Sequence, residues 1–546
     1  MRALVFLCIV FLAVAVQLAY SRQTATIPAW SPDNGDGTYT NPVIYADYSD
    51  PDAIRVGDDY YMTSSSFSHF PGLPILHSKD LVNWTIIGHA VQRYPFDEFS
   101  QPRHGMGIWA PSIRFHNGEF YIYFGDPDRG IFMTKSKNPA GPWEPLRLIH
   151  KALGWIDACP LWDDDGNAYL VHAWANSRSG IKSLLAVNRM NREGTEVLGD
   201  SVVVFDGHVT HPTIEGPKFY KRNGYYYIFA PAGGVKLGWQ SILRSKNIFG
   251  PYESRNVLGQ GSTNVNGPHQ GAWVDTKTGQ DWFIHFQDRY AYGRVVHLQP
   301  MHWENDWPVI GKGRGGSDIG EPVARHAKPD VGTVYPAASP QTSDEFASTS
   351  LGLQWQWEAN GSNDWYSLDA RSGWLRLYSQ PSPVTNLWFA PALLLQKFPA
   401  PVFSATTKLD CSSLQAGEHT GLVVFGQDYG YVGVAKSKET FVLSQVVCTN
   451  ADKGGTEQSN EVTDVGGPDI ILRVDVRPEN PSEIIPRVLC SFSFSTDGQS
   501  FHPLGKPFTA REGMWVGAKV GLFTLRPAEA LTHGYIDVDW FRIEKQ

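Results

Sequence analysis

The stretch Asn117-Gly118-Glu119-Phe120-Tyr121 joins a two-residue turn to an aromatic strand. Asn-Gly favours the tight turn of a β-hairpin because both residues tolerate positive φ. The pattern, a turn with Gly, Asn or Asp before an aromatic run, occurs four more times in the first 290 residues, at 56–61, 165–169, 223–227 and 278–283. The N-terminal half of the chain therefore repeats one hairpin unit.

These units are regularly spaced along the chain. The intervals between their glycines, Gly57, Gly118, Gly166, Gly224 and Gly279, are 61, 48, 58 and 55 residues. Repeats of this length, with room for about four strands each, are typical of propeller blades. The alternative is an irregular β-sandwich in which hairpins recur by chance. Because the register repeats as well as the spacing, we predict a five-bladed β-propeller over residues 38–325.

The composition fits an all-β protein. Aromatic residues make up 13% of the 546 residues, and 53 Gly and 37 Pro punctuate them. Aromatic residues favour strands, whereas Gly and Pro favour turns. The 46 Lys plus Arg against 55 Asp plus Glu give a net charge of −9, with no basic run. This balance argues against nucleic acid as a partner.

The N-terminus has the features of a secretory signal peptide. Arg2 precedes an apolar run to Val16, and Ala19-Tyr20-Ser21 supplies small residues at a cleavage site. We therefore expect residues 1–21 to be removed and the mature protein to be secreted or periplasmic, without membrane insertion. The remaining cysteines are Cys159, Cys411, Cys448 and Cys490, and their spacing does not suit a metal site. One disulfide among the last three of them is possible, and the sequence does not assign it.

A second domain is expected after a proline-containing linker. Residues 326–343 include Pro329, Pro336 and Pro340 in a polar stretch, which is typical of a linker. Residues 344–546 then alternate short strand-like runs with Gly, Asp and Ser turns. That pattern predicts a C-terminal β-sandwich.

Equivalent positions in the five units contain three acids. Nine residues before a fixed turn position stand Asp50, Trp109, Asp157, Glu215 and Gln270, the last beside His269. The first strand of a propeller blade lines the central channel, so these positions should converge on the axis. The sequence thus predicts a ring of three carboxylates.

Such a ring suits acid–base chemistry. Like charges held together at a buried site cannot all ionise easily, so one pKa rises and that group becomes a general acid. Glycoside hydrolysis needs this division between a protonated acid and an ionised partner. Calcium binding is the competing use, although no EF-hand-like loop is present. Each acid alone also has a structural interpretation, as a turn residue or a hydrogen-bonded carboxylate.

Several segments closely resemble glycoside hydrolase family 43, the β-xylosidases and α-L-arabinofuranosidases. The matching motifs are Asn41-Pro42-Val43-Ile44, Ser49-Asp50-Pro51-Asp52, Phe67-Ser68-His69-Phe70-Pro71-Gly72, Trp109-Ala110-Pro111 and Glu215-Gly216-Pro217. Echoes such as Gly373-Trp374-Leu375 and Asp539-Trp540-Phe541 resemble the concanavalin-A-like β-sandwich of the family's xylosidases. The resemblance covers nearly all of the mature chain and implies an inverting mechanism on a five-bladed propeller.

The resemblance also implies roles for the three acids. Asp50 would be the general base that activates water, and Glu215 the general acid. Asp157 would raise the pKa of Glu215 and orient it. Inversion needs room for water, so we expect about 6.5–9.5 Å between the Asp50 and Glu215 carboxyls. One departure is that many relatives read Asp-Pro-Ser where this chain has Asp157-Ala158-Cys159.

Four further residues match family positions around the sugar. Phe67 and Trp109 match aromatic residues that wall the −1 subsite, and Arg294 matches an arginine that contacts sugar hydroxyls. His269 matches a central histidine that in some relatives lies beside a calcium ion or water. We expect no required cofactor, with a structural calcium as the alternative.

The predicted function is therefore an exo-acting, inverting glycoside hydrolase. It would remove terminal β-1,4-linked xylose from xylo-oligosaccharides or xylan of plant cell walls, with the sandwich closing the pocket. The alternatives are an α-L-arabinofuranosidase on arabinoxylan or arabinan, a retaining fructan-type hydrolase, and a non-catalytic carbohydrate-binding propeller.

Overall fold

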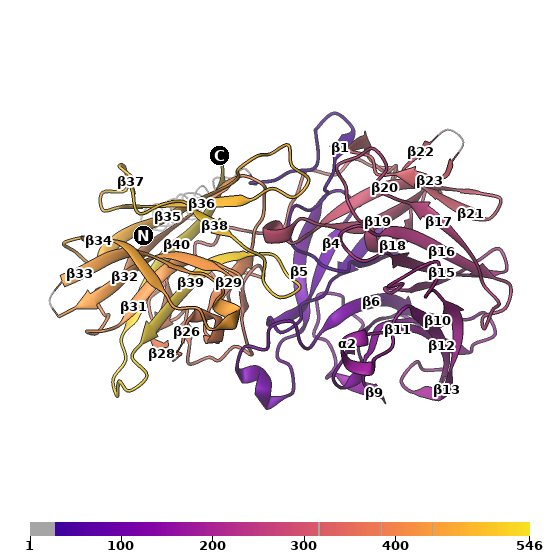
Figure 1. Cartoon of the computed structure of the whole chain (residues 1–546), viewed down its shortest axis with the longest axis horizontal. Helices are drawn as coiled ribbons and strands as arrows, with labels where there is room; N and C mark the ends of the chain where they lie inside the picture. The colour runs from indigo at the N-terminus through magenta and orange to yellow at the C-terminus, as the bar shows by residue number, and fades with distance from the viewer. Residues whose placement is uncertain (1–27, 315–316, 384, 439) are drawn as a thin grey trace, which may run out of the picture.

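The computed structural model describes residues 28–314, 317–383, 385–438 and 440–546. The expected signal peptide, 1–21, lies outside the described residues. Two β domains lie side by side, with the propeller in indigo to rose and the sandwich in orange to yellow (Figure 1). Helical turns in the described residues are short: η1 (Asp97–Ser100), α2 (Asn176–Ser179), η2 (Tyr290–Tyr292), η3 (Leu387–Phe389) and η4 (Ala451–Lys453). No helix in this part of the chain has the length and apolar character needed to cross a membrane.

Five antiparallel sheets of four consecutive strands form the blades, which confirms the five-bladed propeller. Blade one contains β2 (Asp52–Val56), β3 (Asp59–Thr63), β4 (Gly72–Ser78) and β5 (Trp84–Val91). Blade two contains β6 (Trp109–His116), β7 (Glu119–Asp126), β8 (Gly130–Ser136) and β9 (Arg147–Lys151). Blade three contains β10 (Trp155–Trp162), β11 (Ala168–Trp174), β12 (Leu184–Met190) and β13 (Val197–Asp206).

The last two blades have the same strand order. Blade four contains β14 (Lys218–Arg222), β15 (Tyr225–Ala232), β16 (Trp239–Ser245) and β17 (Glu253–Leu258). Two further strands extend this sheet beyond β17, namely β23 (Ser317–Glu321) and β22 (Lys312–Arg314). Blade five contains β18 (His269–Asp275), β19 (Asp281–Asp288), β20 (Arg294–Glu304) and β21 (Trp307–Ile310).

Each repeated turn joins the first and second strands of a blade, as the sequence predicts. In blade two, Asn117 and Gly118 have φ of 49° and 80°, and in blade four Asn223 and Gly224 have 50° and 74°. These values suit the two-residue hairpin for which Asn-Gly is the preferred sequence. The first strands also contact one another across blades, β2 with β6 and β18, and β10 with β6 and β14. They therefore lie at the centre of the ring.

The N-terminal segment joins the last blade to the first. Strand β1 (Thr38–Thr40) pairs with β24 (Arg325–Ala327), which follows the propeller. Ile44 then exchanges backbone hydrogen bonds with Val296 of β20, at 3.2 and 3.0 Å. The segment that leads into blade one is thus bonded to blade five, which closes the ring.

The C-terminal domain is a sandwich of two sheets, as predicted; one is antiparallel, and the other adds one parallel pair, β28 with β39. One sheet contains β25 (Gln356–Trp357), β28 (Gln380–Pro381), β29 (Leu394–Lys397), β31 (His419–Phe425), β32 (Tyr429–Ser437), β33 (Thr440–Cys448), β34 (Gln458–Asp464) and β39 (Lys519–Arg526). The other contains β26 (Tyr366–Ser367), β27 (Leu375–Tyr378), β30 (Phe403–Asp410), β35 (Asp469–Pro478), β36 (Val488–Ser495), β37 (His502–Pro503), β38 (Phe508–Ala510) and β40 (Tyr535–Lys545). Cys159, Cys411, Cys448 and Cys490 are all buried and free.

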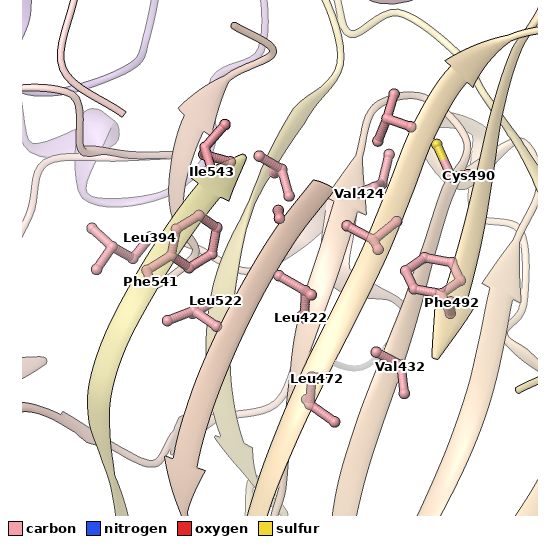
Figure 2. Close-up of a cluster of buried hydrophobic side chains, with 14 of the residues drawn as sticks. Leu394, Leu422, Val424, Val432, Leu472, Cys490, Phe492, Leu522, Phe541 and Ile543 are labelled. Carbon is pink, nitrogen blue, oxygen red and sulfur yellow. The ribbon is translucent and has the colours of Figure 1, made fainter. Parts of the chain in front are cut away.

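Alternating side chains of the two sheets fill the space between them. Figure 2 shows Leu422 and Leu522 of the first sheet near Leu472 and Phe541 of the second. All four side chains are buried. This interdigitation of inward-facing residues is what the period-two pattern of strands produces when two sheets pack face to face.

The segment between β24 and β25 forms no regular strand, and its residues 338–341 lie on blade one. The backbone of Ala338 donates to Asn83 Oδ1 at 3.0 Å, and Gln341 exchanges hydrogen bonds with the backbone of Ile86. The connection between the domains is therefore packed against the propeller.

The sandwich is fixed to the propeller by backbone pairing as well. Phe70 and Trp357 exchange hydrogen bonds of 3.1 and 2.7 Å, and Ala518 donates to the Ala291 carbonyl at 2.8 Å. Such short contacts between main chains leave little freedom for relative motion of the two domains beside them.

Leu522 provides a test of the sandwich core. Its side chain is fully buried, so Leu522→Ala should lower the free energy of unfolding of this domain by about 2–5 kcal/mol, because it leaves a cavity. The matched control is Leu531→Ala, at a fully exposed position, which should change it by less than about 0.5 kcal/mol. Urea unfolding followed by tryptophan fluorescence measures both. Equal effects of the two substitutions would contradict the assigned core.

Candidate active site

The chain enters each first strand through a residue in the left-handed region. These residues are Asp50 (φ 54°), Ala110 (34°), Asp157 (60°), Gly216 (59°) and Gln270 (33°). Register irregularities follow in blades two, three and five. A β-bulge with such a residue turns the side chain away from the regular pleat. The repeat therefore aims one position per blade at the same end of the channel.

This geometry brings the three predicted acids together. Asp50, Asp157 and Glu215 line one cavity of about 150 Å³. Asp50 accepts a 2.6 Å hydrogen bond from the Ser65 hydroxyl and a 3.1 Å bond from Arg294. These donors suit a carboxylate anion. Asp50 is 6% exposed, so the few donors that reach it define its environment.

Asp157 is buried beside the acid of the next blade. Its Oδ2 accepts the backbone N–H of Gly216 at 2.7 Å. Burial raises the pKa of Asp157, the Gly216 N–H opposes that shift, and the Asp50 charge adds to it. Because Gly216 directly follows Glu215, this bond also fixes the backbone that carries the third acid.

Glu215 has the properties of a neutral acid. Its side chain is about one third exposed, toward the cavity. Burial from bulk water raises its pKa, and the Asp157 and Asp50 carboxylates raise it further. The Arg294 guanidinium only partly offsets this effect. A carboxyl group in this position keeps its proton at a pH where an ordinary glutamate has lost it.

Contacts with Asp47 and Phe286 hold Arg294 in place. Its backbone N–H donates to Asp47 Oδ1 at 2.8 Å, and its guanidinium lies 5.0 Å from the ring centre of Phe286. The preceding residue must be small, because a Cβ on Gly293 would lie 2.5 Å from the Asp47 side chain. Asp47 therefore positions Arg294, which reaches across to Asp50.

Aromatic side chains form the opposite wall. Phe67 and Trp109 line the cavity as the sequence predicts, with ring centroids 6.1 Å apart. Trp515, from the sandwich, adds a third ring at 6.1 Å from Trp109 and remains 49% exposed. Such faces suit the apolar C–H surface of a sugar ring. The cavity is also smaller than the roughly 300–1,000 Å³ of sites for drug-sized ligands, so it suits a single sugar unit.

His269 lines the same cavity. Burial lowers its pKa to about 3, and Arg294 contributes to that shift. Its Nε2 lies 3.4 Å from Glu215 Oε1, and neither ring nitrogen has a hydrogen-bond partner in the part of the chain that the structure describes. No group of three or more metal-ligating side chains in the described residues includes His269.

Sequence reasoning missed three residues of the site. Ser65 bonds Asp50 and also accepts the backbone N–H of Ala110 at 2.7 Å. Gln270 occupies one of the five equivalent positions, but the repeat does not predict its hydrogen bond to the Asp157 carboxylate. Trp515 lies in the glycine-flanked run Glu512–Gly517, a signal for a turn but not for contact with the propeller.

A protonated acid, an ionised carboxylate and an aromatic wall around one sugar-sized cavity are the components of glycoside hydrolysis. The fold and the site thus define a glycoside hydrolase built on a five-bladed propeller. The family description "Glycosyl hydrolases family 43" matches residues 39–308, and "Beta xylosidase C-terminal Concanavalin A-like domain" matches residues 343–544. The chain belongs to glycosyl hydrolases family 43, an inverting family.

Two curated relatives illustrate the range of the family. A Xylanibacter ruminicola protein, whose name as a beta-xylosidase is itself provisional, is 41% identical over 90% of this chain and 87% of its own length. The non-reducing end alpha-L-arabinofuranosidase BoGH43B of Bacteroides ovatus is 30% identical over 72% of this chain and 74% of its own.

Solved structures agree along the whole fold. The GH43 protein BlXynB of Bacillus licheniformis matches with a TM-score of 0.78 and 27% identity, over 93% of this chain and all of that one. A bifunctional GH43-CE protein of Bacteroides eggerthii gives 0.81 and 28% over 93% of this chain. This chain spans 64% of the length of that bifunctional protein.

Proposed function

We propose that the protein is an exo-acting β-D-xylosidase that releases xylose from the ends of β-1,4-linked xylo-oligosaccharides or xylan. The single observation that carries the proposal is the cavity in which Asp50, Asp157 and Glu215 meet Arg294 and three aromatic side chains. Its small size supports one terminal sugar, and the provisional name of the Xylanibacter relative supports xylose.

Asp50 acts as the general base. Ser65 and Arg294 both donate to its carboxylate, so its position is fixed before substrate binds. It takes a proton from a water molecule, whose oxygen then attacks the anomeric carbon. The attack comes from the face opposite the departing oxygen, which inverts the configuration at that carbon.

Glu215 acts as the general acid. It gives its proton to the glycosidic oxygen as the bond to the anomeric carbon breaks. Asp157 acts through Glu215 as a positioning residue, since its charge favours the protonated form and its bond to Gly216 fixes the backbone. His269 is neutral beside Glu215 and can bond a water molecule, and the proposed reaction needs no cofactor.

Trp515 supports the assignment of exo-action. It lies against Trp109 at the rim, and the loop that carries it is docked through the Gly517 N–H, 3.0 Å from Asp47 Oδ2. A wall contributed by the second domain closes one end of the sugar site. A polysaccharide then enters only by its terminus.

An α-L-arabinofuranosidase is the second candidate. The Bacteroides ovatus relative carries that name, and a terminal arabinofuranose presents a hydroxyl pattern similar to that of xylose. A non-catalytic carbohydrate-binding propeller is disfavoured, because sugar binding alone does not need a carboxyl group held protonated beside two others.

The proposal predicts different responses to loss of the acid and of the base. Glu215→Gln should lower kcat on xylobiose by roughly 10²–10⁴-fold, because the leaving hydroxyl needs a proton. The loss on p-nitrophenyl β-D-xylopyranoside should be much smaller, because p-nitrophenolate leaves without one. Asp50→Asn should abolish turnover of both substrates. Glu253→Gln, at an exposed ion pair with Arg244, is the matched control and should leave all rates unchanged.

Three further readouts complete that experiment. NMR should detect α-xylose as the first product, and β-xylose would overturn the inverting assignment in favour of a fructan-type retaining reaction. Faster turnover of p-nitrophenyl α-L-arabinofuranoside than of the xyloside would establish the second candidate. Absence of turnover on every glycoside by folded protein would overturn the enzyme proposal. Added calcium should leave kcat unchanged.

Replacement of Asp157 should shift the pH profile of kcat/KM. Its negative charge raises the pKa of Glu215, so Asp157→Asn should lower that pKa. Glu215 then loses its proton at lower pH, and the alkaline limb of kcat/KM on xylobiose should move down by about one pH unit. An alkaline limb that stays in place while kcat falls would limit Asp157 to orientation.

Replacement of Trp515 should weaken substrate binding more than it slows the chemical step. Trp515→Ala should raise KM for xylobiose about tenfold with a smaller change in kcat, because the ring touches sugar and no reacting atom. Trp515→Phe should retain most of the affinity. On xylotetraose the wild type should release xylose and xylotriose first; xylobiose as the first product would contradict exo-action.

A further inference from the structure

Three potential ligand atoms meet where the two domains join, outside the sugar cavity. They are His69 Nε2, between β3 and β4, His104 Nδ1, on the loop before β6, and Glu358 Oε2, directly after β25 of the sandwich. All three atoms lie within 4.8 Å of one another. His69 and Glu358 are 3% and 1% exposed, so water has little access to them.

Hydrogen bonds at the far side of each ring fix which nitrogens point into this cluster. His69 Nδ1 lies 2.9 Å from the Ser66 carbonyl, and His104 Nε2 lies 2.8 Å from the Trp388 carbonyl. A carbonyl only accepts, so these two nitrogens carry the ring hydrogens. In the neutral rings, His69 Nε2 and His104 Nδ1 therefore carry no hydrogen and present lone pairs.

The cluster thus consists of acceptors without a donor. His69 Nε2 is 3.2 Å and His104 Nδ1 is 3.5 Å from the same carboxylate oxygen, Glu358 Oε2. Within the described residues, His69 Nε2 and Glu358 Oε2 have no hydrogen-bond partner. The Lys519 ammonium binds the other oxygen, Oε1, and so leaves Oε2 unshared. Buried acceptors left in this state are costly unless a cation or a proton lies between them.

We propose that His69, His104 and Glu358 form a binding site for a divalent transition-metal ion of the zinc class, which joins the propeller to the sandwich. Zinc bonds to histidine nitrogen and carboxylate oxygen are about 2.0–2.2 Å long, so tetrahedral ligand atoms lie about 3.3–3.5 Å apart. The distances to Glu358 Oε2, 3.2 and 3.5 Å, fit this spacing. Nitrogen donors select such ions over calcium or magnesium.

The surroundings match those of metal-binding histidines elsewhere. A histidine that binds a metal usually donates its other ring N–H to a carbonyl or carboxylate, which fixes the tautomer and the ring orientation. Both histidines have that arrangement here. His104 also stacks on Trp388 of the sandwich, with ring centroids 3.7 Å apart. The rings are therefore oriented before any ion binds.

The position of the site suggests its role. His104 is followed by Gly105, whose carbonyl accepts the Trp109 indole N–H at 3.0 Å. A Cβ on Gly105 would lie 2.9 Å from the Trp515 ring, so this loop packs directly under the aromatic wall. An ion bound to His104 and Glu358 would fix that wall across the domain boundary. It takes no part in the hydrolysis.

The test uses the full mature protein without a histidine tag. After zinc loading and dialysis, elemental analysis should find about one zinc per chain, and zinc should raise the melting temperature of chelator-treated protein. Cobalt(II) should produce the visible absorption bands of a tetrahedral site. His104→Ala should lower zinc affinity at least about tenfold, whereas His302→Ala, beside the exposed Glu304, is the matched control and should bind zinc as the wild type does.

His104→Cys keeps the proposal testable if the alanine variant fails to fold. A thiolate at this position should add a sulfur-to-cobalt charge-transfer band that the wild type lacks. Wild-type protein that keeps no zinc, gains no thermal stability from it and gives no tetrahedral cobalt spectrum would overturn the proposal; a proton shared between histidine and Glu358 would then hold the cluster together.

Discussion

The mutual repulsion of three carboxyl groups in one small cavity is the constraint on which the rest of this structure depends. Asp50, Asp157 and Glu215 line a space of about 150 Å³, where they cannot all ionise freely. The ring of blades keeps them together, because each acid lies in or just before the first strand of a blade, and the first strands lie together at the centre of the ring. A left-handed backbone at a residue such as Asp157 costs about 1–2 kcal/mol, which the surrounding sheets offset. The strained backbone is part of the arrangement that places Asp157 and Asp50 beside Glu215, and their charges raise the pKa of Glu215.

The acids differ in their environments although they share one register. Asp50 accepts from a hydroxyl and a guanidinium, Asp157 accepts from a backbone N–H, and Glu215 has no comparable donor among the described residues. The proposed division into base, positioning group and acid therefore rests on what each blade supplies next to a repeated position. Similar reasoning explains why the altered turn after Asp157 is tolerated: the contact that matters there is between the Asp157 carboxylate and the Gly216 backbone, which no side chain of 158–160 provides.

The repeat made much of this predictable from sequence, and its limits are physical too. The nine-residue interval to each turn identified Asp50, Asp157, Glu215 and Trp109, because a first strand of fixed length converts sequence spacing into position on the channel. Ser65 and Asp47 escaped, since they lie between the repeated positions and act through hydrogen bonds that no periodicity encodes. Trp515 and the cluster of His69, His104 and Glu358 depend on how two domains dock. Docking arises from the fit of two folded surfaces, and neither domain's own pattern of strands contains that information.

The two domains consequently contribute different properties to one pocket. The propeller supplies the acids, which lie in or just before the first strands of its blades. The sandwich supplies only the loop 512–517, docked through Gly517 against Gly293, where a Cβ on Gly517 would lie 2.6 Å from the Gly293 nitrogen. This close contact fixes Gly517, and the exposed ring of Trp515 lies at the rim of the cavity. Substitution of Trp515 changes the rim of the cavity, whereas substitution of Gly517 would reach the carboxyl groups, because its N–H bonds Asp47, which holds Arg294. A family that acts on both xylosides and arabinofuranosides gains from that separation, because the same proton transfers serve either substrate.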